Sequence, residues 1–356
     1  MRLGIIGLPQ SGKTTVFNAL TRGHQPTTMS GGRYEVHSAV VDVPDERVDR
    51  LSAMFKPEKT IYAKVNYADI TGLEGASDKS GISGQLLNQL TQMDGFVHVV
   101  RYFENVNVPH PSGSIDPGRD IAAMDGELLL NDLIAVERKQ ERLVDERRKG
   151  GGRDRGLIDR EISLFEKLHA ALAADTPLRD IDITYEEEKA LSGFGFLTRK
   201  PVLILLNLSE EQVPPELDYP HHRSQLAPLF GKLEMDLAQL PPEDAELFMA
   251  EYGIQELGLQ RVIGLSYDLL GLQSFFTVGE DEVRAWTIQR GTPAVEAAGA
   301  IHSDLQKGFI RAEVVRYEDL IALGGLAEAR QKGKLRLEGK EYIVQDGEIV
   351  HIRFNI

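Results

Sequence analysis

The chain has 356 residues, a formal net charge of −15 and no cysteine. This length suggests two or three domains, and the missing cysteines exclude disulfides, thiolate catalysis and cysteine-ligated metal sites and favour a reducing cytoplasm. With 42% hydrophobic and 27% charged residues, no run of about 18 apolar residues and no signal-peptide pattern at the N-terminus, we expect a globular protein without a membrane span, too acidic to coat nucleic acid indiscriminately.

The first expected strand, L-G-I-I (3–6), runs directly into G-L-P-Q-S-G-K-T (7–14) and then into a predicted helix at 14–21. Gly7, Gly12, Lys13 and Thr14 match the phosphate-binding pattern G-x-x-x-x-G-K-S/T. Glycines let successive backbone N–H groups point inward as an anion nest, and the helix offers its positive end to the phosphates. Lys13 would reach the β and γ phosphates, and the Thr14 hydroxyl would hold Mg²⁺. A glycine-rich turn without function is the alternative, and the flanking strand and helix favour the phosphate site.

A second motif, Asp69-Ile70-Thr71-Gly72, ends the expected strand at 64–70. In switch-type nucleotidases the aspartate of D-x-x-G contacts Mg²⁺ through water, and the glycine N–H senses the γ phosphate. We therefore expect these roles for Asp69 and Gly72. A plain turn is the alternative, and the single strand at 37–43 between this motif and the phosphate loop strengthens the switch interpretation.

Two further apolar stretches, 96–103 and 201–210, predict strands of a parallel sheet that helices cover on both faces. The second contains Asn207-Leu208-Ser209-Glu210 where guanine-specific switches have N-K-x-D, and Asn207 is expected to meet the base. Glu210 is one methylene longer than the aspartate that pairs with guanine N1 and N2, so that paired geometry should be lost. Losing such bonds removes roughly 10⁴-fold discrimination. We therefore predict ATP binding, with GTP weaker or comparable; a capped turn is the alternative.

A helical arm is predicted between these two strands. Apolar residues at helical spacing indicate a first helix at about 127–149 and a second helix after it, namely Leu129, Leu133, Val136 and Leu143, then Ile158, Ile162, Phe165 and Leu168. The connection R-R-K-G-G-G-R-D-R (147–155) gives this hairpin a basic tip. The candidates for contact with RNA phosphate are Arg147, Arg148, Lys149, Arg153 and Arg155. A solvated helix face is the equally weighted alternative.

Residues 278–356 are expected to alternate as strands around one short helix. They contain no catalytic constellation, so we assign them a binding role. Within them, Lys307-Gly308-Phe309-Ile310-Arg311 presents apolar and basic groups together. Packing of Phe309 in the core is the stronger alternative for that aromatic side chain.

Taken together, the motifs resemble one family, the YchF-type Obg-like ATPases. The matching stretches are G-L-P-x-x-G-K-T-T-x-F-N-A-L-T, V-V-x-V-P-D-x-R-x-D-x-L, D-I-x-G-L, V-H-V-V-R-x-F-E-N and N-L-S-E. Residues 275–315 and 334–356 resemble the TGS domain of this family, and the similarity covers almost the whole chain.

The resemblance implies an α/β fold in three parts. A mainly parallel P-loop NTPase G domain is expected at 1–126 and 200–277, an inserted α-helical hairpin at 127–199, and a β-grasp, ubiquitin-like TGS domain at 278–356. The resemblance also implies association with ribosomes and translation, and slow hydrolysis of ATP.

The chain departs from the family pattern around the switches. Gln10 stands where members usually have an asparagine that is thought to bind K⁺, so K⁺ binding is left open. Arg33 falls where members have the switch I threonine, and switch II is one residue shorter than usual. Leu73 stands where Ras-type enzymes orient water with a glutamine, and the family shares this apolar residue, so slow intrinsic turnover is expected.

His110, in F-E-N-V-N-V-P-H-P, matches a histidine of the family and is the candidate to replace that glutamine. An imidazole suits a water-orienting or proton-accepting role. A solvated loop histidine is the alternative.

The nucleotide-binding residues expected from the sequence are Gly7, Pro9, Gln10, Ser11, Gly12, Lys13, Thr14, Thr15, Gly72, Asn207, Leu208, Glu210, Gly231, Lys232 and Leu233. Thr14 and, through water, Asp69 are the expected metal ligands. The leading interpretation is a cytoplasmic, Mg²⁺-dependent ATPase switch, expected to be a monomer, that docks on the ribosome or its RNA through arm and TGS domain. An Obg-type GTPase and a nucleotide-gated adaptor with little turnover are the alternatives.

Overall fold

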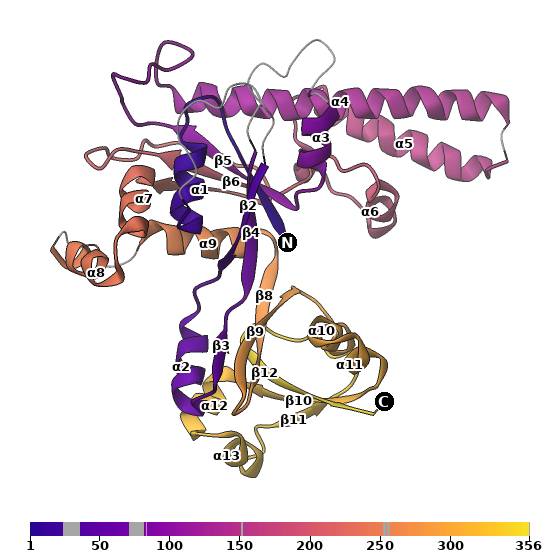
Figure 1. Cartoon of the computed structure of the whole chain (residues 1–356). Coiled ribbons are helices and arrows are strands. Elements are labelled where there is room, and N and C mark those ends of the chain that lie inside the picture. Colours follow the sequence, from indigo (N-terminus) through magenta and orange to yellow (C-terminus); the bar gives the residue numbers. More distant parts are fainter. Residues whose placement is uncertain are drawn as a thin grey trace. The chain divides into compact units, whose positions relative to one another are not determined.

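The structure is a computed structural model that describes residues 1–23, 36–70, 82, 84–150, 152–251, 254 and 257–355 (Figure 1). The chain divides into two compact units. The first unit contains Met1–Ala39 and Asn66–Val262, and the second contains Val40–Val65 and Ile263–Ile356. Segment 40–65 therefore groups with the C-terminal part of the chain. The three domain boundaries expected from the sequence, which assign this segment to the G domain, stay a prediction.

The first unit is built on a six-stranded sheet with the order β2-β4-β1-β5-β6-β7. Its strands are β1 (Arg2–Ile6), β2 (Val36–Asp42), β4 (Lys64–Ile70), β5 (Gly95–Arg101), β6 (Val202–Asn207) and β7 (Ser224–Leu229). From β4 to β7 all neighbours pair in parallel. Every residue of β5 and β6 is buried, as near-continuous apolar runs predict for a sheet covered on both faces.

The helices of the first unit follow in chain order. They are α1 (Lys13–Thr21), α3 (Gly84–Thr91), α4 (Pro117–Lys149), α5 (Arg155–Leu172), the short 3₁₀ helix η1 (Leu178–Asp180), α6 (Tyr185–Leu191), α7 (Gly231–Gln239) and α8 (Pro242–Glu251), while α9 (Gly258–Leu269) runs from the first unit into the second. Leu86 and Leu90 of α3 and Met124 of α4 pack onto Phe96 and Ile204 of the sheet. Helices α1 and α7 lie side by side. The expected P-loop G-domain architecture is confirmed.

The arm is a hairpin of α4 and α5, which lie side by side and extend away from the sheet of the first unit (Figure 1). The two predicted apolar stripes face each other in one core, in which Val136, Leu143 and Leu168 are fully buried. Helix α4 begins at Pro117, well before the expected start near residue 127, because Asp116 caps it and a proline is favoured in the first turn. Gly150 ends it in the left-handed conformation (φ 67°).

The second unit contains another six-stranded sheet, with the order β11-β10-β12-β8-β9-β3. Its elements are α2 (Glu46–Phe55), β3 (Lys59–Ile61), β8 (Leu272–Val278), β9 (Glu282–Gln289), α10 (Ala294–Ile301), α11 (Ser303–Lys307), β10 (Phe309–Arg316), α12 (Tyr317–Leu323), α13 (Leu326–Gln331), β11 (Arg336–Glu338) and β12 (Glu348–Phe354). Strand β12 is parallel to β8 and antiparallel to β10, and β3 adds a parallel edge to β9. Alanines of α10 and the Phe309 side chain close the core.

The second unit corrects one expectation and confirms another. Four short helices, α10 to α13, occur in its described C-terminal part, where the sequence predicted one. They have five to eight residues, too few for helical periodicity to stand out from an alternating strand pattern. Phe309 is 5% exposed, so its core-packing interpretation is correct.

Within the second unit, the V-P-D-x-R motif connects segment 40–65 to the C-terminal part of the chain. Asp45 caps α2 by accepting from the Arg47 backbone N–H (3.0 Å). The Arg47 guanidinium pairs with Asp45 and, at 2.7 Å, with Asp346.

Among the described residues, no helix has the length and apolar character that a membrane span requires.

Candidate nucleotide-binding site

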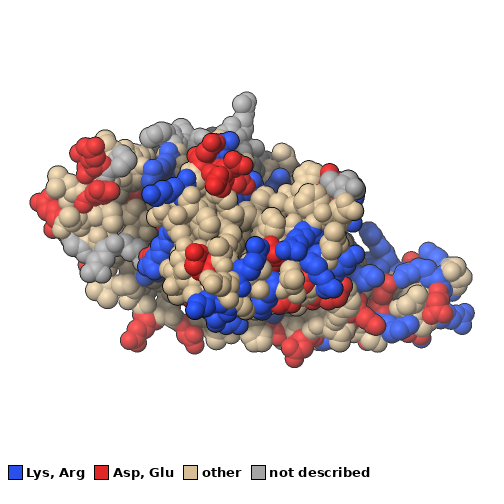
Figure 2. All heavy atoms as spheres, turned by 90° about the horizontal axis from the view of Figure 1, so that it is seen from below, with Lys and Arg blue, Asp and Glu red and all other residues tan. Residues whose placement is uncertain are grey.

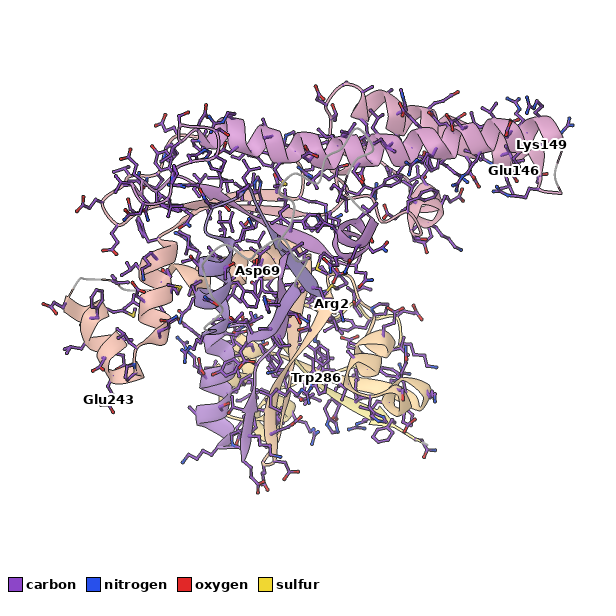
Figure 3. The ribbon with its side chains drawn as sticks, turned by 45° about the horizontal axis from the view of Figure 1, so that its top comes forward. Arg2, Asp69, Glu146, Lys149, Glu243 and Trp286 are labelled. Carbon is purple, nitrogen blue, oxygen red and sulfur yellow. The ribbon has the colours of Figure 1, made fainter. Side chains whose placement is uncertain are left out.

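The phosphate loop, Asp69 and Asn207 come together where β1, β4 and β6 end. The carboxyl ends of parallel strands meet at one edge of a sheet, and ligands bind there where the strand order changes direction. Here β4 and β5 flank β1 on opposite sides. Asp69 stands near the end of β4 (labelled in Figure 3), and Asn207 ends β6.

The loop between β1 and α1 depends on its two motif glycines. Gly7 has φ 153° and Gly12 has φ 93°, values that favour glycine. A Cβ atom on Gly7 would lie 2.3 Å from the Val99 carbonyl oxygen, and one on Gly12 would lie 2.2 Å from Asn207 Nδ2. These glycines therefore let the loop approach β5 and β6 closely, a packing reason that the motif alone does not reveal.

Lys13 folds back over this loop. Its ammonium group donates hydrogen bonds to the Gly7 and Leu8 carbonyl oxygens, each at 2.9 Å. Gln10 has φ 58°, a left-handed conformation in which asparagine, the usual family residue, is several-fold enriched. The Gln10 Oε1 and Ser11 Oγ atoms are buried without a hydrogen-bond partner among the described residues. The loop thus holds unsatisfied oxygen atoms beside its backbone N–H groups.

Thr14 and Asp69, the two expected metal ligands, lie next to each other. Thr14 Oγ1 donates to Asp69 Oδ2 at 2.9 Å. Asp69 is fully buried, burial raises its pKa, and the Thr14 hydrogen bond opposes that rise. Within the described part of the chain, Asp69 Oδ1 has no hydrogen-bond partner. A hydroxyl and a carboxylate with a free oxygen fit Mg²⁺, which is held by few protein oxygens together with water and phosphate.

Asn207 joins the phosphate side of the site to the expected base side. Its Nδ2 atom donates to the Ser11 carbonyl oxygen at 3.0 Å. Its Oδ1 atom accepts from the Gly231 backbone N–H at 3.1 Å, and a Cβ on Gly231 would lie only 2.6 Å from that oxygen. Asn207 is 3% exposed, so its amide bridges two loops and presents little surface of its own.

The remaining residues expected at the base differ in exposure. Leu208 is 1% exposed and lies in the hydrophobic core of the first unit, so the described conformation does not offer its side chain to a purine. Glu210 is exposed and, with Leu233, Phe230 and Phe248, lines a cavity of about 460 Å³. Lys232 is exposed and pairs with Asp236.

His98, on β5, is a buried polar residue that the sequence did not single out. It is 2% exposed. Burial lowers the pKa of His98 to about 3, and the charge on Lys13 adds to this effect, so the imidazole is neutral. Its Nε2 atom has no hydrogen-bond partner within the described residues.

His110 is held away from solvent by the first turn of α4. Its Nδ1 atom accepts from the Ser112 backbone N–H at 3.1 Å, so the proton is on Nε2, which donates to Asp120 Oδ2 at 2.9 Å. Arg119 also pairs with Asp120. The His110 side chain is only 5% exposed, so the solvated-loop alternative is wrong. Both ring nitrogens are engaged here, and the catalytic role stays a prediction.

Sequence reasoning missed the residues that hold the loops after β5 and β6. Arg101, 3% exposed, donates to the Phe103 and Val108 carbonyl oxygens. Gln212 donates to the Tyr102 carbonyl oxygen at 2.9 Å and accepts from the Ser209 backbone N–H. The sequence signal that could have identified Arg101 and Gln212 is a polar residue at the end of a buried strand or a few residues after it. Gly72 and Arg33, with Leu73, lie outside the described residues.

Two protein-family models match this chain. The family described as "50S ribosome-binding GTPase" matches residues 2–139. The family YchF-GTPase_C, described as a protein of unknown function, matches residues 272–355.

Similar proteins extend over the whole chain. The chain is 40% identical to "Ribosome-binding ATPase YchF" of Bacillus subtilis, over 99% of both chains. It is 34% identical to "Obg-like ATPase 1" of Caenorhabditis elegans, over 100% of this chain and 92% of the relative. The solved Schizosaccharomyces pombe YchF GTPase superposes with a TM-score of 0.82 at 31% identity, over 99% of this chain and 97% of that chain. Full-length similarity at these levels, together with a P-loop between β1 and α1, means that this chain belongs to the YchF family of P-loop NTPases.

Proposed function

We propose that this chain is a Mg²⁺-dependent ATPase that binds the ribosome and hydrolyses ATP slowly on its own. The observation that carries the proposal is the Asn207 bridge, because it holds the phosphate loop and the N-terminus of α7 in one site. The relatives named ribosome-binding ATPases support both parts of the proposal.

On the phosphate side, the N–H groups at the start of α1 bind the triphosphate, where the helix dipole favours negative charge. Lys13 exchanges its bonds to the Gly7 and Leu8 carbonyls for bonds to phosphate oxygens. Thr14 and, through water, Asp69 hold Mg²⁺, which when bound neutralises charge on the β and γ phosphates. Gly72 is the proposed sensor of the γ phosphate.

On the base side, the chain lacks the guanine clamp. Leu208 replaces the lysine of N-K-x-D, and Glu210 replaces the aspartate. Because the longer carboxylate cannot accept both guanine donors in the same geometry, the site loses its means of rejecting adenine. We therefore assign ATP as the preferred nucleotide, with GTP weaker or comparable.

Intrinsic turnover should be slow because the candidate water-orienting side chain is already engaged in other hydrogen bonds. The imidazole of His110 is bound at both nitrogens. A partner that loosens the His110–Asp120 pair would free this group. This makes the ribosome the proposed source of acceleration, and His110 the proposed water-orienting residue.

The second unit is proposed to be a TGS domain with a binding role. Its order β9-β8-β12-β10-β11, with α10 packed in the core, is consistent with a ubiquitin-like β-grasp sheet. We further propose that the arm and this domain contact the ribosome, that the protein is a monomer, and that it acts in the cytoplasm. An Obg-type GTPase and a nucleotide-gated adaptor with little turnover remain the alternatives.

Calorimetry with non-hydrolysable ATP and GTP analogues, in Mg²⁺ buffer and in excess chelator, tests nucleotide choice and metal dependence. We expect tighter binding of the ATP analogue, and weaker binding without Mg²⁺. Preference for the GTP analogue would identify an Obg-type GTPase instead. Phosphate release at saturating ATP, measured in K⁺ and in Na⁺ with and without ribosomes, then separates a slow ATPase from an adaptor, which would release none in any condition.

A further inference from the structure

Residues 195–200, here called the return segment, lead from the arm back to β6 and touch two helices at once. We propose that the return segment transmits movement of the arm to α3, with Asp132 and Lys200 as its positioning residues. This inference rests on the proposed function, because the movement would let a partner bound to the arm influence hydrolysis. The contacts themselves lie within the first unit.

Asp132 fastens the return segment to the arm. This carboxylate is on α4 and is 1% exposed. Its Oδ1 atom accepts from the Leu197 N–H at 2.9 Å, and its Oδ2 atom accepts from the Thr198 N–H and hydroxyl, both at 2.7 Å. Three donors on one buried carboxylate fix the segment in a single position, because leaving buried N–H groups unpaired is costly.

Lys200 fastens the same segment to α3. Its ammonium group donates to the Leu90 carbonyl at 3.0 Å, to the Thr91 carbonyl at 2.7 Å and to the Met93 carbonyl. A cation on the last carbonyls of a helix also complements the helix dipole. At the other end of the segment, a Cβ on Gly195 would lie 3.1 Å from Thr91 Cβ, so the segment packs closely against α3.

The two attachments are close enough to act as one. Thr198, which binds Asp132, and Lys200 are two residues apart. The negative charge of Asp132 also attracts the positive charge of Lys200, so the two attachments interact electrostatically. Asp132 lies near the middle of the 33-residue helix α4, and residues 133–149 beyond it extend about 25 Å at 1.5 Å per residue, so this outer half works as a lever that is held at Asp132. Helix α3 directly follows 71–83, the stretch that contains the proposed sensor Gly72.

The first experiment needs no ribosome. Asp132→Asn keeps the size of the side chain but turns one acceptor into a donor that faces the donors of Thr198. In hydrogen-exchange mass spectrometry of the nucleotide-free protein, we expect amides 84–91 to exchange about threefold faster or more. Glu137→Gln, an exposed carboxylate on the same helix, is the matched control and should match the parent. Faster exchange confined to the neighbourhood of 132 and 196–199 would overturn the relay.

The second experiment measures function. Asp132→Asn and Lys200→Met should each lower ribosome-stimulated phosphate release about tenfold, while basal release and ribosome co-sedimentation stay unchanged. Lys189→Met, on exposed α6, is the control for the lysine variant. Full stimulation in both variants would overturn the inference, and a parallel loss of basal activity would identify these residues as merely structural and overturn it equally.

The two readouts separate this inference from the proposed function. If ribosomes fail to stimulate the parent protein, the proposed function fails, and the exchange measurement alone decides on the relay. If Asp132→Asn does not fold, Thr198→Val replaces it, since this change removes one of the three donors and keeps the carboxylate. The same faster exchange at 84–91 is then expected, and unchanged exchange overturns the relay.

Discussion

Asn207 shows how a single side chain sets demands on residues far away in the sequence. Its amide leaves no room for a Cβ atom at Gly12 or Gly231, so the position of one asparagine side chain requires glycine at two other positions. The sequence predicted Asn207 for the base and Gly12 for the phosphates. It could not predict that both roles share one hydrogen-bonded junction, because that depends on how closely β6 approaches the loop after β1.

Lys13→Ala should abolish most nucleotide binding and leave the fold intact. Bonds from a charged donor to phosphate are worth about 1.5–3 kcal/mol each, so affinity for ATP should fall on the order of 100-fold. Calorimetry measures the affinity, and circular dichroism checks the fold. Lys64→Ala, an exposed lysine paired with Asp42, is the control. Normal ATP binding by Lys13→Ala would show that the phosphate site is elsewhere.

Glu210→Asp should shift nucleotide preference toward GTP. The shorter carboxylate regains the geometry for the two guanine donors, and one recovered charged hydrogen bond is worth about tenfold in affinity. Competition of GTP against ATP measures the ratio, with Glu211→Asp, the next exposed carboxylate, as control. We leave Leu208 unchanged because it lies in the core. An unaltered ratio would argue that Glu210 does not face the base.

His98 should make the first unit sensitive to acid. Burial holds its folded-state pKa near 3, below the ordinary value of 6.5. Above pH 6.5 the His98 ring is neutral in both the folded and the unfolded chain. Between pH 6.5 and the folded-state pKa, the unfolded chain binds a proton at His98 and the folded chain does not. The free energy of unfolding should then fall by about 1.4 kcal/mol per pH unit until the folded pKa is reached.

Urea titrations from about pH 7 to pH 4 test this dependence. His98→Leu should flatten it relative to the parent, and His302→Leu, an exposed histidine, should not. Parallel curves for parent and His98→Leu would mean that another group controls acid unfolding.

At the scale of elements, hydrophobic periodicity predicted the long helices of the arm and missed the local capping signal that sets where the first of them begins. The stripes on α4 and α5 were foreseen because four apolar residues on each recur at helical spacing. The early start of α4 was missed because Asp116 and Pro117 act through capping, and the apolar pattern there belongs to the sheet core through Ile121 and Met124.

The arm tip is less basic in space than in sequence. Arg147 pairs with Asp159 at 3.0 Å, Arg148 with Asp145 at 2.9 Å, and Arg153 with Glu146 at 3.1 Å. Figure 2 shows basic and acidic side chains mixed along the arm, which projects to the right. Figure 3 places Glu146 and Lys149 at the far end of the arm, away from Asp69. These pairs must open before the cations can bind phosphate.

Arg148→Gln with Lys149→Gln should weaken ribosome co-sedimentation and reduce its salt dependence. Each lost phosphate contact lowers the slope of log affinity against log salt by about 0.7–0.9. Arg22→Gln with Lys189→Gln makes the same charge change elsewhere on the first unit. Identical slopes for parent and tip variant would remove the tip from the binding surface.

At the scale of the whole molecule, the chain passes between the two units three times, after residues 39, 65 and 262. The sequence resemblance ended the G domain near residue 277 and could not show that 40–65 packs with the other unit. That outcome depends on β3 pairing with β9, a contact between segments more than 200 residues apart.

A fragment of residues 263–356 should therefore be incomplete. Without β3, the edge of β9 from Glu282 to Arg284 lacks its partner strand, and open edges favour self-association. We expect the fragment to sediment as oligomers, and a fusion of 40–65 to 263–356 to be monomeric. A fragment that is monomeric and as heat-stable as the fusion would contradict this assignment.

The position of β12 has a consequence for synthesis. This last strand lies between β10 and β8, in the middle of its sheet. Proteins are made from the N-terminus and generally fold unit by unit, yet here β3 emerges more than 200 residues before β9, the strand with which it pairs. Until β8 and β9 are made, the Val48 and Leu51 side chains of α2, fully buried in the structure, lack the strands against which α2 packs. A chain that lacks β12 would thus leave β8 and β10 without the strand that joins them, although every other strand of the sheet had been made.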